Sequence, residues 1–278
     1  MYIQTGKEDL TEAIGRFNED LKRVSNWCKG VGLKINPSKS QAILIGYHKL
    51  LNSIDRPNVP QISLDCTPIP HRESVKSLGV TMDENLTWTP HIHSLIQKTY
   101  SALHSLKIFK NIFSIKLKMF LIKALVIPIF DYCDIVYSDI GRVLDIKLQR
   151  AQNACARYIY NSRKSDYVTP LFSELSWLKL SERRQYHSVC LLFQILANKT
   201  PKYLANHFHF LYTHHDRDTR SRTDNQLLIP HHRTTAYTKS FTVSASRTWN
   251  TLPETVRGAH SLTSFERMCY SHFLNGTE

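Results

Sequence analysis

Paired carboxylates are the first groups to seek in a basic chain, because two of them can hold the metal ions that drive phosphoryl transfer. The 278-residue sequence has 36 Lys and Arg against 23 Asp and Glu, a formal net charge of +13, yet it contains no Asp-Asp dipeptide. Asp131 and Asp134 have the spacing of helix-surface acids beside a buried aromatic residue. Asp216 and Asp218 lie among arginines, which indicates a solvated pair. We therefore predict no metal site in this chain.

Histidines and cysteines are the other candidate metal ligands. Six histidines gather in one polar stretch, at His207, His209, His214, His215, His231 and His232. A zinc site needs ligands fixed on rigid elements, so we interpret these as polar loop residues. The six cysteines lie at least 22 residues apart, which excludes a Cys-x-x-Cys pair. We expect reduced thiols, mostly in the core.

The short sequence motifs of serine hydrolases and of nucleotide-binding proteins are absent. The sequence has no Gly-x-Ser-x-Gly turn, no Gly-x-x-x-x-Gly-Lys loop and no Gly-x-Gly-x-x-Gly fingerprint. The longest apolar stretch, residues 119–135, is interrupted by a lysine, a proline and two aspartates. A membrane helix needs about 20 apolar residues, so we predict no membrane partner. The N-terminus does not resemble a signal peptide, which predicts an intracellular protein.

Positive charge is concentrated in one stretch of the chain. Residues 86–130 have no carboxylate and six lysines, at Lys98, Lys107, Lys110, Lys116, Lys118 and Lys123. Neutralising phosphate groups releases condensed counterions, so such a stretch is typical of nucleic-acid binding. The solvated face of ordinary helices has the same composition, and both interpretations stay open.

Residues 1–84 predict a small α+β part. A capping box, Thr5-Gly-Lys-Glu8, precedes an apolar helical stripe over residues 10–28 that stops at Gly30. Short β-like runs follow at residues 33–35, 41–45, 62–64, 67–69 and 75–80. We expect a small antiparallel sheet with one long helix.

Helical periodicity predominates after Trp88. It predicts helices over residues 92–106, 114–125, 145–159 and 181–196, a long loop over 206–240, and short terminal helices over 241–249 and 263–273. Three cations lie away from the apolar face of the third helix: Lys147, Arg150 and Arg157. The fold class is α+β, in three parts: residues 1–84, 85–165 and 166–278.

Five segments, taken in order, together resemble one known protein family. The first is residues 20–28 followed by Gly32-Leu-Lys-Ile-Asn36-Pro-Ser-Lys39-Ser40. The second is Ser77-Leu78-Gly79-Val80 with the following Leu86-Thr-Trp88. The others are residues 148–157, 174–183 and 241–253. Together they resemble the C-terminal part of the reverse transcriptase of non-LTR (LINE-type, jockey-like) retrotransposons, and the first matches each fixed position of that family's D motif.

The resemblance implies a partial palm, a helical thumb and a C-terminal region. In the family a Tyr-x-Asp-Asp hairpin lies just before the strand that matches residues 1–4, and this sequence lacks it. It also lacks the earlier metal-binding Asp, the fingers and the endonuclease. Mg²⁺ is implied for the intact enzyme, and no cofactor for this chain. We therefore expect no polymerase activity from the chain alone.

The resemblance also implies roles for individual residues. Lys39 matches the D-motif lysine near the incoming nucleotide, and Leu78 and Gly79 match the primer grip. Eight cations are implied to bind the template–primer backbone: Lys98, Lys107, Lys110, Lys116, Lys118, Lys147, Arg150 and Arg157. The implied partners are an RNA template, a DNA primer and the missing parts of the same polyprotein, in a cytoplasmic ribonucleoprotein or the nucleus.

Two alternatives stay open. The chain could be a domesticated, non-enzymatic RNA-binding or scaffold protein whose basic face meets its partner. It could also be a metal-dependent hydrolase built from the histidine cluster, which would require bound zinc. One group of residues is expected to pack the core in any of these cases: Trp249, Asn250, Leu252 and Pro253. An aromatic residue beside Leu-Pro more often closes a core than contacts a base.

Overall fold

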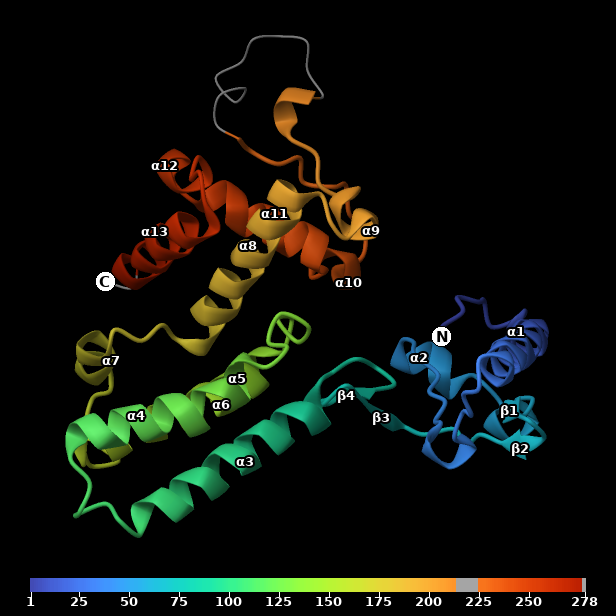
Figure 1. The fold of residues 1–278 in the computed structure, drawn as a ribbon, viewed down its shortest axis with the longest axis horizontal. Coiled ribbons are helices and arrows are strands. Elements are labelled where there is room, and N and C mark those ends of the chain that lie inside the picture. The colour runs from blue at the N-terminus through green and yellow to red at the C-terminus, as the bar shows by residue number, and fades with distance from the viewer. Residues whose placement is uncertain (214–224, 277–278) are drawn as a thin grey trace. The chain divides into compact units, whose positions relative to one another are not determined.

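The apolar stripe after Leu10 forms one long helix, α1 (Leu10–Gly30), in the computed structural model, which describes residues 1–213 and 225–276 (Figure 1). The chain forms two compact units, residues 1–93 and 94–278, so the predicted three-part division stays a prediction. The helix ends where predicted, but the predicted capping box is wrong. Asp9 is the N-cap residue, and the Thr5 hydroxyl donates instead to the carbonyl of Gly6.

The first unit packs α1 on a small hairpin. β1 (Ser63–Leu64) pairs antiparallel with β2 (Thr67–Pro68), as the sequence predicted. Asp65, in the turn between them, accepts hydrogen bonds from the Ser25 hydroxyl at 2.8 Å and the Lys29 ammonium at 2.9 Å. Both donors lie on α1, so the turn is tied to the helix. The core between these elements comprises Ile14, Ile62, Leu64 and Ile69.

The run predicted as one strand, residues 75–80, is a second hairpin. β3 (Ser74–Ser77) pairs antiparallel with β4 (Val80–Asp83). Leu78 and Gly79 form the turn with φ of 45° and 87°, and positive φ at both central residues is the geometry of a type I′ turn. The fold is α+β as predicted, with two small antiparallel sheets in place of one.

The remaining predicted strands of this unit do not form. Residues 33–35 are irregular, and the 41–45 run makes one isolated bridge, between Ala42 and His71. Short helical turns lie here instead, at η1 (Pro37–Lys39), α2 (His48–Asn52) and η2 (Arg56–Asn58). The Arg56 guanidinium makes two hydrogen bonds, of 2.9 and 2.7 Å, with the buried carboxylate of Glu84. The pair ties η2 to the residue after β4.

The second unit is helical, as predicted. Its first helices are α3 (Thr89–Lys107), which begins in the first unit, α4 (Ile115–Leu125), α5 (Ile127–Asp131) and α6 (Arg142–Tyr160). The Ser114 hydroxyl accepts a hydrogen bond from the Leu117 amide at 3.3 Å and caps α4, as predicted. Pro128 lies in the first turn of α5, where the missing amide hydrogen leaves no hydrogen bond unmade, so α4 ends at Leu125 and a new helix begins.

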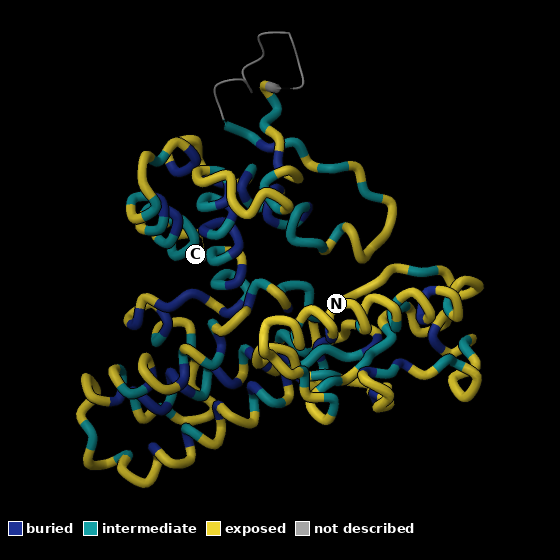
Figure 2. Tube along the Cα trace, turned by 45° about the vertical axis from the view of Figure 1, so that its right-hand side comes forward, coloured by how far each residue is buried: buried dark blue, intermediate teal, exposed yellow. Residues whose placement is uncertain are grey.

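The C-terminal helices enclose a core of their own. They are α7 (Thr169–Leu175), α8 (Leu180–Asn198), α9 (Lys202–Ala205), α10 (Thr235–Thr238), α11 (Phe241–Thr251), α12 (Glu254–Arg257) and α13 (Leu262–Asn275), with η3 (Leu211–Thr213). Figure 2 shows buried segments where α8, α11 and α13 face one another. The Phe265 ring lies 5.6 Å from that of Trp249 and 4.5 Å from that of Phe193.

The predicted packing anchors are confirmed except for one. Trp249 and Leu252 are each 2% exposed. The Asn250 side chain makes two 2.8 Å hydrogen bonds with the backbone of Leu227 and so holds the chain that precedes α10. Pro253 is exposed, because it begins α12 rather than filling the core.

The predictions for thiols and loops are partly confirmed. All six cysteines are free, but only Cys155, Cys190 and Cys269 are buried. The predicted loop over residues 206–240 contains α10, η3 and a bridge between Phe210 and Leu227 among its described residues. In the described part of the chain no helix has the length and apolar content to span a bilayer.

Lys118 lies inside the second unit and not on its surface. Its side chain is 1% exposed, and its ammonium donates a 2.8 Å hydrogen bond to the Asn161 side chain just after α6. The ammonium lies 5.5 Å from the centre of the Tyr158 ring. Burial lowers the pKa of Lys118. The expectation that Lys118 faces a phosphate backbone is therefore wrong, because this lysine joins α4 to α6.

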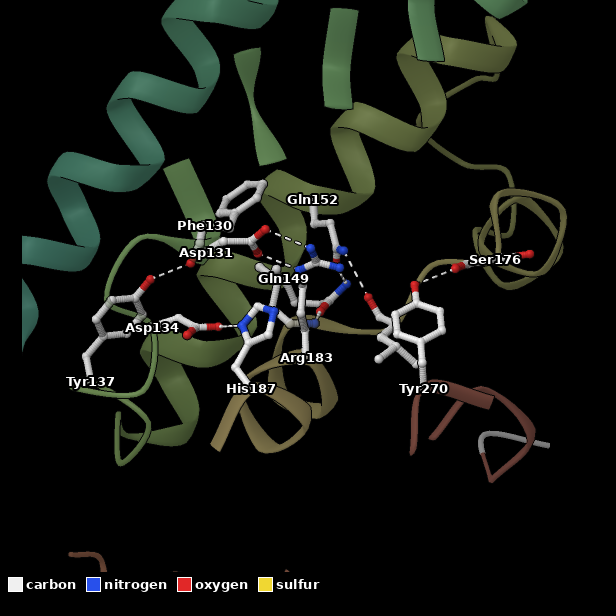
Figure 3. Close-up of polar contacts among 12 residues, drawn as sticks. Phe130, Asp131, Asp134, Tyr137, Gln149, Gln152, Ser176, Arg183, His187 and Tyr270 are labelled. Atoms are coloured by element: carbon white, nitrogen blue, oxygen red, sulfur yellow. Dashed lines mark hydrogen bonds and ion pairs between the residues drawn. The ribbon is translucent and has the colours of Figure 1, made fainter. Parts of the chain in front are cut away.

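Charged side chains join α8 to the region around α5 (Figure 3). The Arg183 guanidinium makes two hydrogen bonds with Asp131, one of them 2.7 Å long. Four residues later, His187 Nδ1 shares a 2.6 Å hydrogen bond with the buried carboxylate of Asp134. Residues four apart lie on one helix face, so a single face of α8 meets both acids. The Tyr137 hydroxyl donates to the Phe130 carbonyl at 2.7 Å and closes the turn between them.

Glutamines of α6 position the start of α8. The Gln149 side-chain oxygen accepts a 2.9 Å hydrogen bond from the Leu180 amide, which has no partner within its own helix. The Gln152 side-chain amide donates to the Leu178 carbonyl at 3.0 Å. Hydrogen bonds from two glutamine side chains thus hold the start of α8 against α6.

Replacing Lys118 by Gln is expected to lower the free energy of unfolding by about 1–2 kcal/mol, because a buried charge-assisted hydrogen bond is lost. Replacing the exposed Lys116 by Gln is expected to change it by less than about 0.5 kcal/mol. Urea denaturation followed by circular dichroism measures both. Equal losses would contradict the interior position of Lys118.

Replacing Asp134 by Asn tests how much the buried carboxylate lowers the free energy of unfolding once it is ionised. Burial raises the pKa of Asp134 and the His187 hydrogen bond lowers it in part. The folded state therefore holds this proton more tightly than the unfolded state, and the stability that Asp134 contributes falls as the pH rises above about 4. Asn does not ionise, so the variant is expected to gain stability relative to the unchanged chain as the pH is raised.

Denaturation between about pH 4 and pH 7 measures this difference. Replacing the exposed Asp166 by Asn controls for the loss of one negative charge. A difference that shrinks as the pH rises would mean that the ion pair with His187 outweighs the burial of Asp134.

Candidate functional site

The predicted backbone-binding lysines occupy α3, α4 and the turn between these helices. Lys98, Lys107 and Lys116 are exposed, and Lys110 is half-buried. None of the four forms an ion pair within the described residues, and no carboxylate lies between residues 86 and 130. These lysines are available to an external anion.

Exposed aromatic and aliphatic side chains lie beside these lysines. On α4, Lys116, Phe120 and Lys123 follow at intervals of four and three residues, so they share one face, and Phe120 is 66% exposed. In the turn between α3 and α4, Ile112 is 77% exposed. Basic residues interleaved with exposed apolar ones suit a nucleic acid, whose phosphates and sugars present both kinds of surface.

The three cations of α6 that were predicted to bind a backbone differ in what they contact. Lys147 and Arg150 are exposed. Arg157 is half-buried, and its guanidinium donates a 3.1 Å hydrogen bond to the Asp166 carbonyl, in the loop after α6. Arg157 therefore holds that loop, and Lys147 and Arg150 are the exposed members of the three.

The other predicted site residues lie in the first unit. Leu78 is 88% exposed at the tip of the β3–β4 hairpin, and Gly79 supplies the positive φ that the turn requires. Lys39 is exposed and ends the short turn η1. The Asn36 side chain starts this turn by accepting hydrogen bonds from the amide and the hydroxyl of Ser38, at 3.0 and 2.7 Å.

One group of side chains has the composition of a metal site. In the described part of the chain, Asp131, Asp134 and His187 alone bring three candidate ligand atoms within 4.8 Å of one another. Figure 3 shows that Arg183 already occupies the Asp131 carboxylate and that the His187 ring faces Asp134. Mg²⁺ prefers oxygen ligands and a near-ideal octahedron with bound waters. These residues do not fit the magnesium site of a polymerase.

The interpretation of Asp131 and Asp134 as helix-surface acids is wrong for Asp134. Asp134 is 3% exposed and lies after α5, and the buried aromatic residue beside it is Tyr137, whereas Tyr132 is exposed. The sequence analysis missed the basic partners. Arg183 and His187 are four residues apart and so lie on one face of a helix, and Asp131 and Asp134 are three residues apart. These similar spacings were the signal in the sequence that the two pairs could meet.

The histidine cluster does not assemble a metal site among the described residues. His207, His209 and His231 are exposed. The His232 ring contacts the Pro230 carbonyl at 3.0 Å and the Arg247 guanidinium at 2.7 Å. His214 and His215, like Asp216 and Asp218, lie outside the described residues.

Comparison with known proteins gives one informative similarity. The chain is 24% identical over 180 residues to the probable RNA-directed DNA polymerase from transposon BS of Drosophila melanogaster. The aligned region covers 64% of this chain and 19% of that protein, so the chain spans about a fifth of its length. No protein-family model and no solved structure matches the chain. The similarity supports a reverse-transcriptase-like relationship for this chain.

Proposed function

We propose that this chain is the part of a non-LTR (LINE-type, jockey-like) retrotransposon reverse transcriptase that follows the catalytic aspartates. In this proposal its thumb-like helices bind the backbone of an RNA template paired with a DNA primer, inside a ribonucleoprotein. The similarity to a transposon polymerase and the five motif segments support the relationship. The observation that carries the binding role is the set of exposed lysines on α3 and α4 that form no ion pair in the described part of the chain.

Lysine is suited to this role because its ammonium is a mobile point charge on a flexible stem. Such groups follow a phosphate backbone without reading its sequence, and each contact releases counterions. Lys98, Lys107 and Lys116 act in this way, with Lys147 and Arg150 of α6 as further contacts. Lys118 is excluded by its burial, whereas the half-buried Arg157 stays a predicted contact.

The first unit supplies the residues that match the primer grip and the D motif. Leu78 and Gly79 form a hairpin tip from which the backbone can approach a primer strand closely. Lys39 would act near the incoming nucleotide of the intact enzyme. In this chain it lacks the paired aspartates that would hold the metal ions, so it cannot support nucleotide transfer.

Binding of a labelled RNA–DNA hybrid by the full chain, measured by fluorescence anisotropy against salt concentration, tests the backbone contact. The triple replacement Lys98→Gln, Lys107→Gln and Lys116→Gln is expected to weaken binding at least about tenfold and to reduce the salt slope by about two to three.

The matched control replaces Lys199, Lys202 and Arg267 by Gln. It removes the same charge from exposed positions of the second unit that lie outside α3, α4 and α6. The salt slope counts phosphate contacts, so removing charges that make no such contact is expected to leave it unchanged. Equal effects of the two triple variants would refute a localised lysine contact.

Primer extension on an RNA template with Mg²⁺ or Mn²⁺ tests the expected lack of turnover. The chain alone is expected to give no extension, since it has no paired carboxylates for two metal ions. Extension by purified protein that is lost in Asp131→Asn would contradict this, because it would assign catalysis to the Asp131–Asp134–His187 group.

A further inference from the structure

A cavity of about 460 Å³ opens in the second unit among α6, α8, α10 and α11. Residues of α8 and α11 at helical spacing present one polar face each to it, including Ser181 and Arg184 of α8 and Ser244 and Arg247 of α11. Its volume is that of an ordinary small-ligand site. None of the lysines assigned to the hybrid contact lines it.

The lining carries surplus positive charge. Four cations border the cavity, Arg142, Arg184, Lys239 and Arg247, against the two carboxylates of Asp139 and Asp145. Asp145 is engaged by Arg184 in an ion pair. The Lys239 ammonium donates to the backbone carbonyl of Asp139 at 3.3 Å, and Arg247 contacts a histidine ring, so neither is neutralised by these bonds. Within the described residues Arg142 has no ion pair.

Arg184 has a hydrogen-bonding capacity that the protein leaves unused. Its side chain is 6% exposed, and its Nε atom is buried without a hydrogen-bond partner among the described residues. A buried donor without an acceptor costs free energy, so such groups are rare unless something else satisfies them. The Nε atom is itself closed to solvent, so other atoms of Arg184 border the cavity, and the ion pair with Asp145 holds this side chain in place.

The remaining lining favours an oxygen-rich anion over an apolar molecule. Six serine and threonine residues border the cavity, and Ile140 is its one aliphatic residue. Their hydroxyls donate hydrogen bonds, and arginine guanidinium groups match phosphate oxygens in a two-pronged geometry. The N-terminus of α6 begins at Arg142 in the lining, and its helix dipole favours negative charge there.

We propose that this cavity binds the phosphate group of a nucleotide, either free or within a single-stranded nucleic acid. The cavity lies where two of the five motif segments meet, since Ser181 belongs to residues 174–183 and Arg247 to residues 241–253. These segments have no role in the hybrid contact. The proposal does not depend on that contact, because the two sites share no residue.

Titration calorimetry of the full chain with inorganic phosphate, uridine monophosphate and single-stranded hexauridylate tests the site. Saturable binding of one monophosphate per chain is expected. The double replacement Arg142→Gln and Arg247→Gln, at two exposed lining positions, is expected to weaken it at least about tenfold. Hexauridylate that binds at least about tenfold more tightly than the monophosphate would identify a strand as the source, and equal affinities a free nucleotide.

The matched control replaces Arg163 and Arg233, two exposed arginines outside the lining, by Gln. Its affinity is expected to stay within about twofold of the unchanged chain. Absence of saturable binding of all three ligands up to about 10 mM would overturn the proposal, as would equal losses in the two double variants. The Arg142 and Arg247 variant keeps the lysines of α3 and α4, so hybrid binding by it separates this test from that of the proposed function.

Discussion

The second unit depends on how α8 is held against α5 and α6, and ion pairs as well as apolar packing specify this contact. Arg183 and Arg184 are neighbours in sequence, so their side chains leave the helix about 100° apart. Arg183 meets Asp131 at the end of α5, and Arg184 meets Asp145 in the first turn of α6. Two ion pairs in different directions fix α8 in rotation as well as in position. Any other rotation would leave partly buried charges without partners, which is costly.

The cations of the second unit fall into two groups, those that hold the fold together and those that face solvent. Lys118, Arg157, Arg183 and Arg184 each have an acceptor within the protein. The exposed lysines of α3 and α4 form no ion pair within residues 1–213 and 225–276, and their own stretch, residues 86–130, contains no carboxylate. Acids are thus present where they join helices and absent where the lysines are exposed. A surface of this kind favours an external polyanion more strongly than composition alone, since ordinary solvated helices mix both signs of charge.

Local signals in the sequence predicted most of the helices. The stripe of α1 and the Ser114 cap of α4 depend on residues within one or two turns, and both are confirmed. The β3–β4 hairpin was missed because its two four-residue strands read as one run with a turn of Leu78 and Gly79 inside it. Thr5 was misassigned because a capping box requires the chain to enter the helix at that residue, and here it enters at Asp9.

The candidate sites were less predictable, because their contacts join distant residues. Lys118 was expected at the surface from its charge, and its burial depends on Asn161, 43 positions later. The pairs of Asp131 and Asp134 depend on α8 residues 52 and 53 positions away. No periodicity within one helix contains this information.

The two cationic surfaces of the second unit differ in their residue chemistry. The surface of α3 and α4 is built from lysines, whose mobile ammonium groups suit a regular backbone that is bound without regard to sequence. Three of the four cations that border the cavity are arginines, whose planar guanidinium groups match the oxygens of a phosphate. Because Arg184 both orders α8 and lines the cavity, the ion pair that positions this helix also positions one cation of the lining. The two proposed sites therefore differ in chemistry, and neither needs a metal ion to hold its anion.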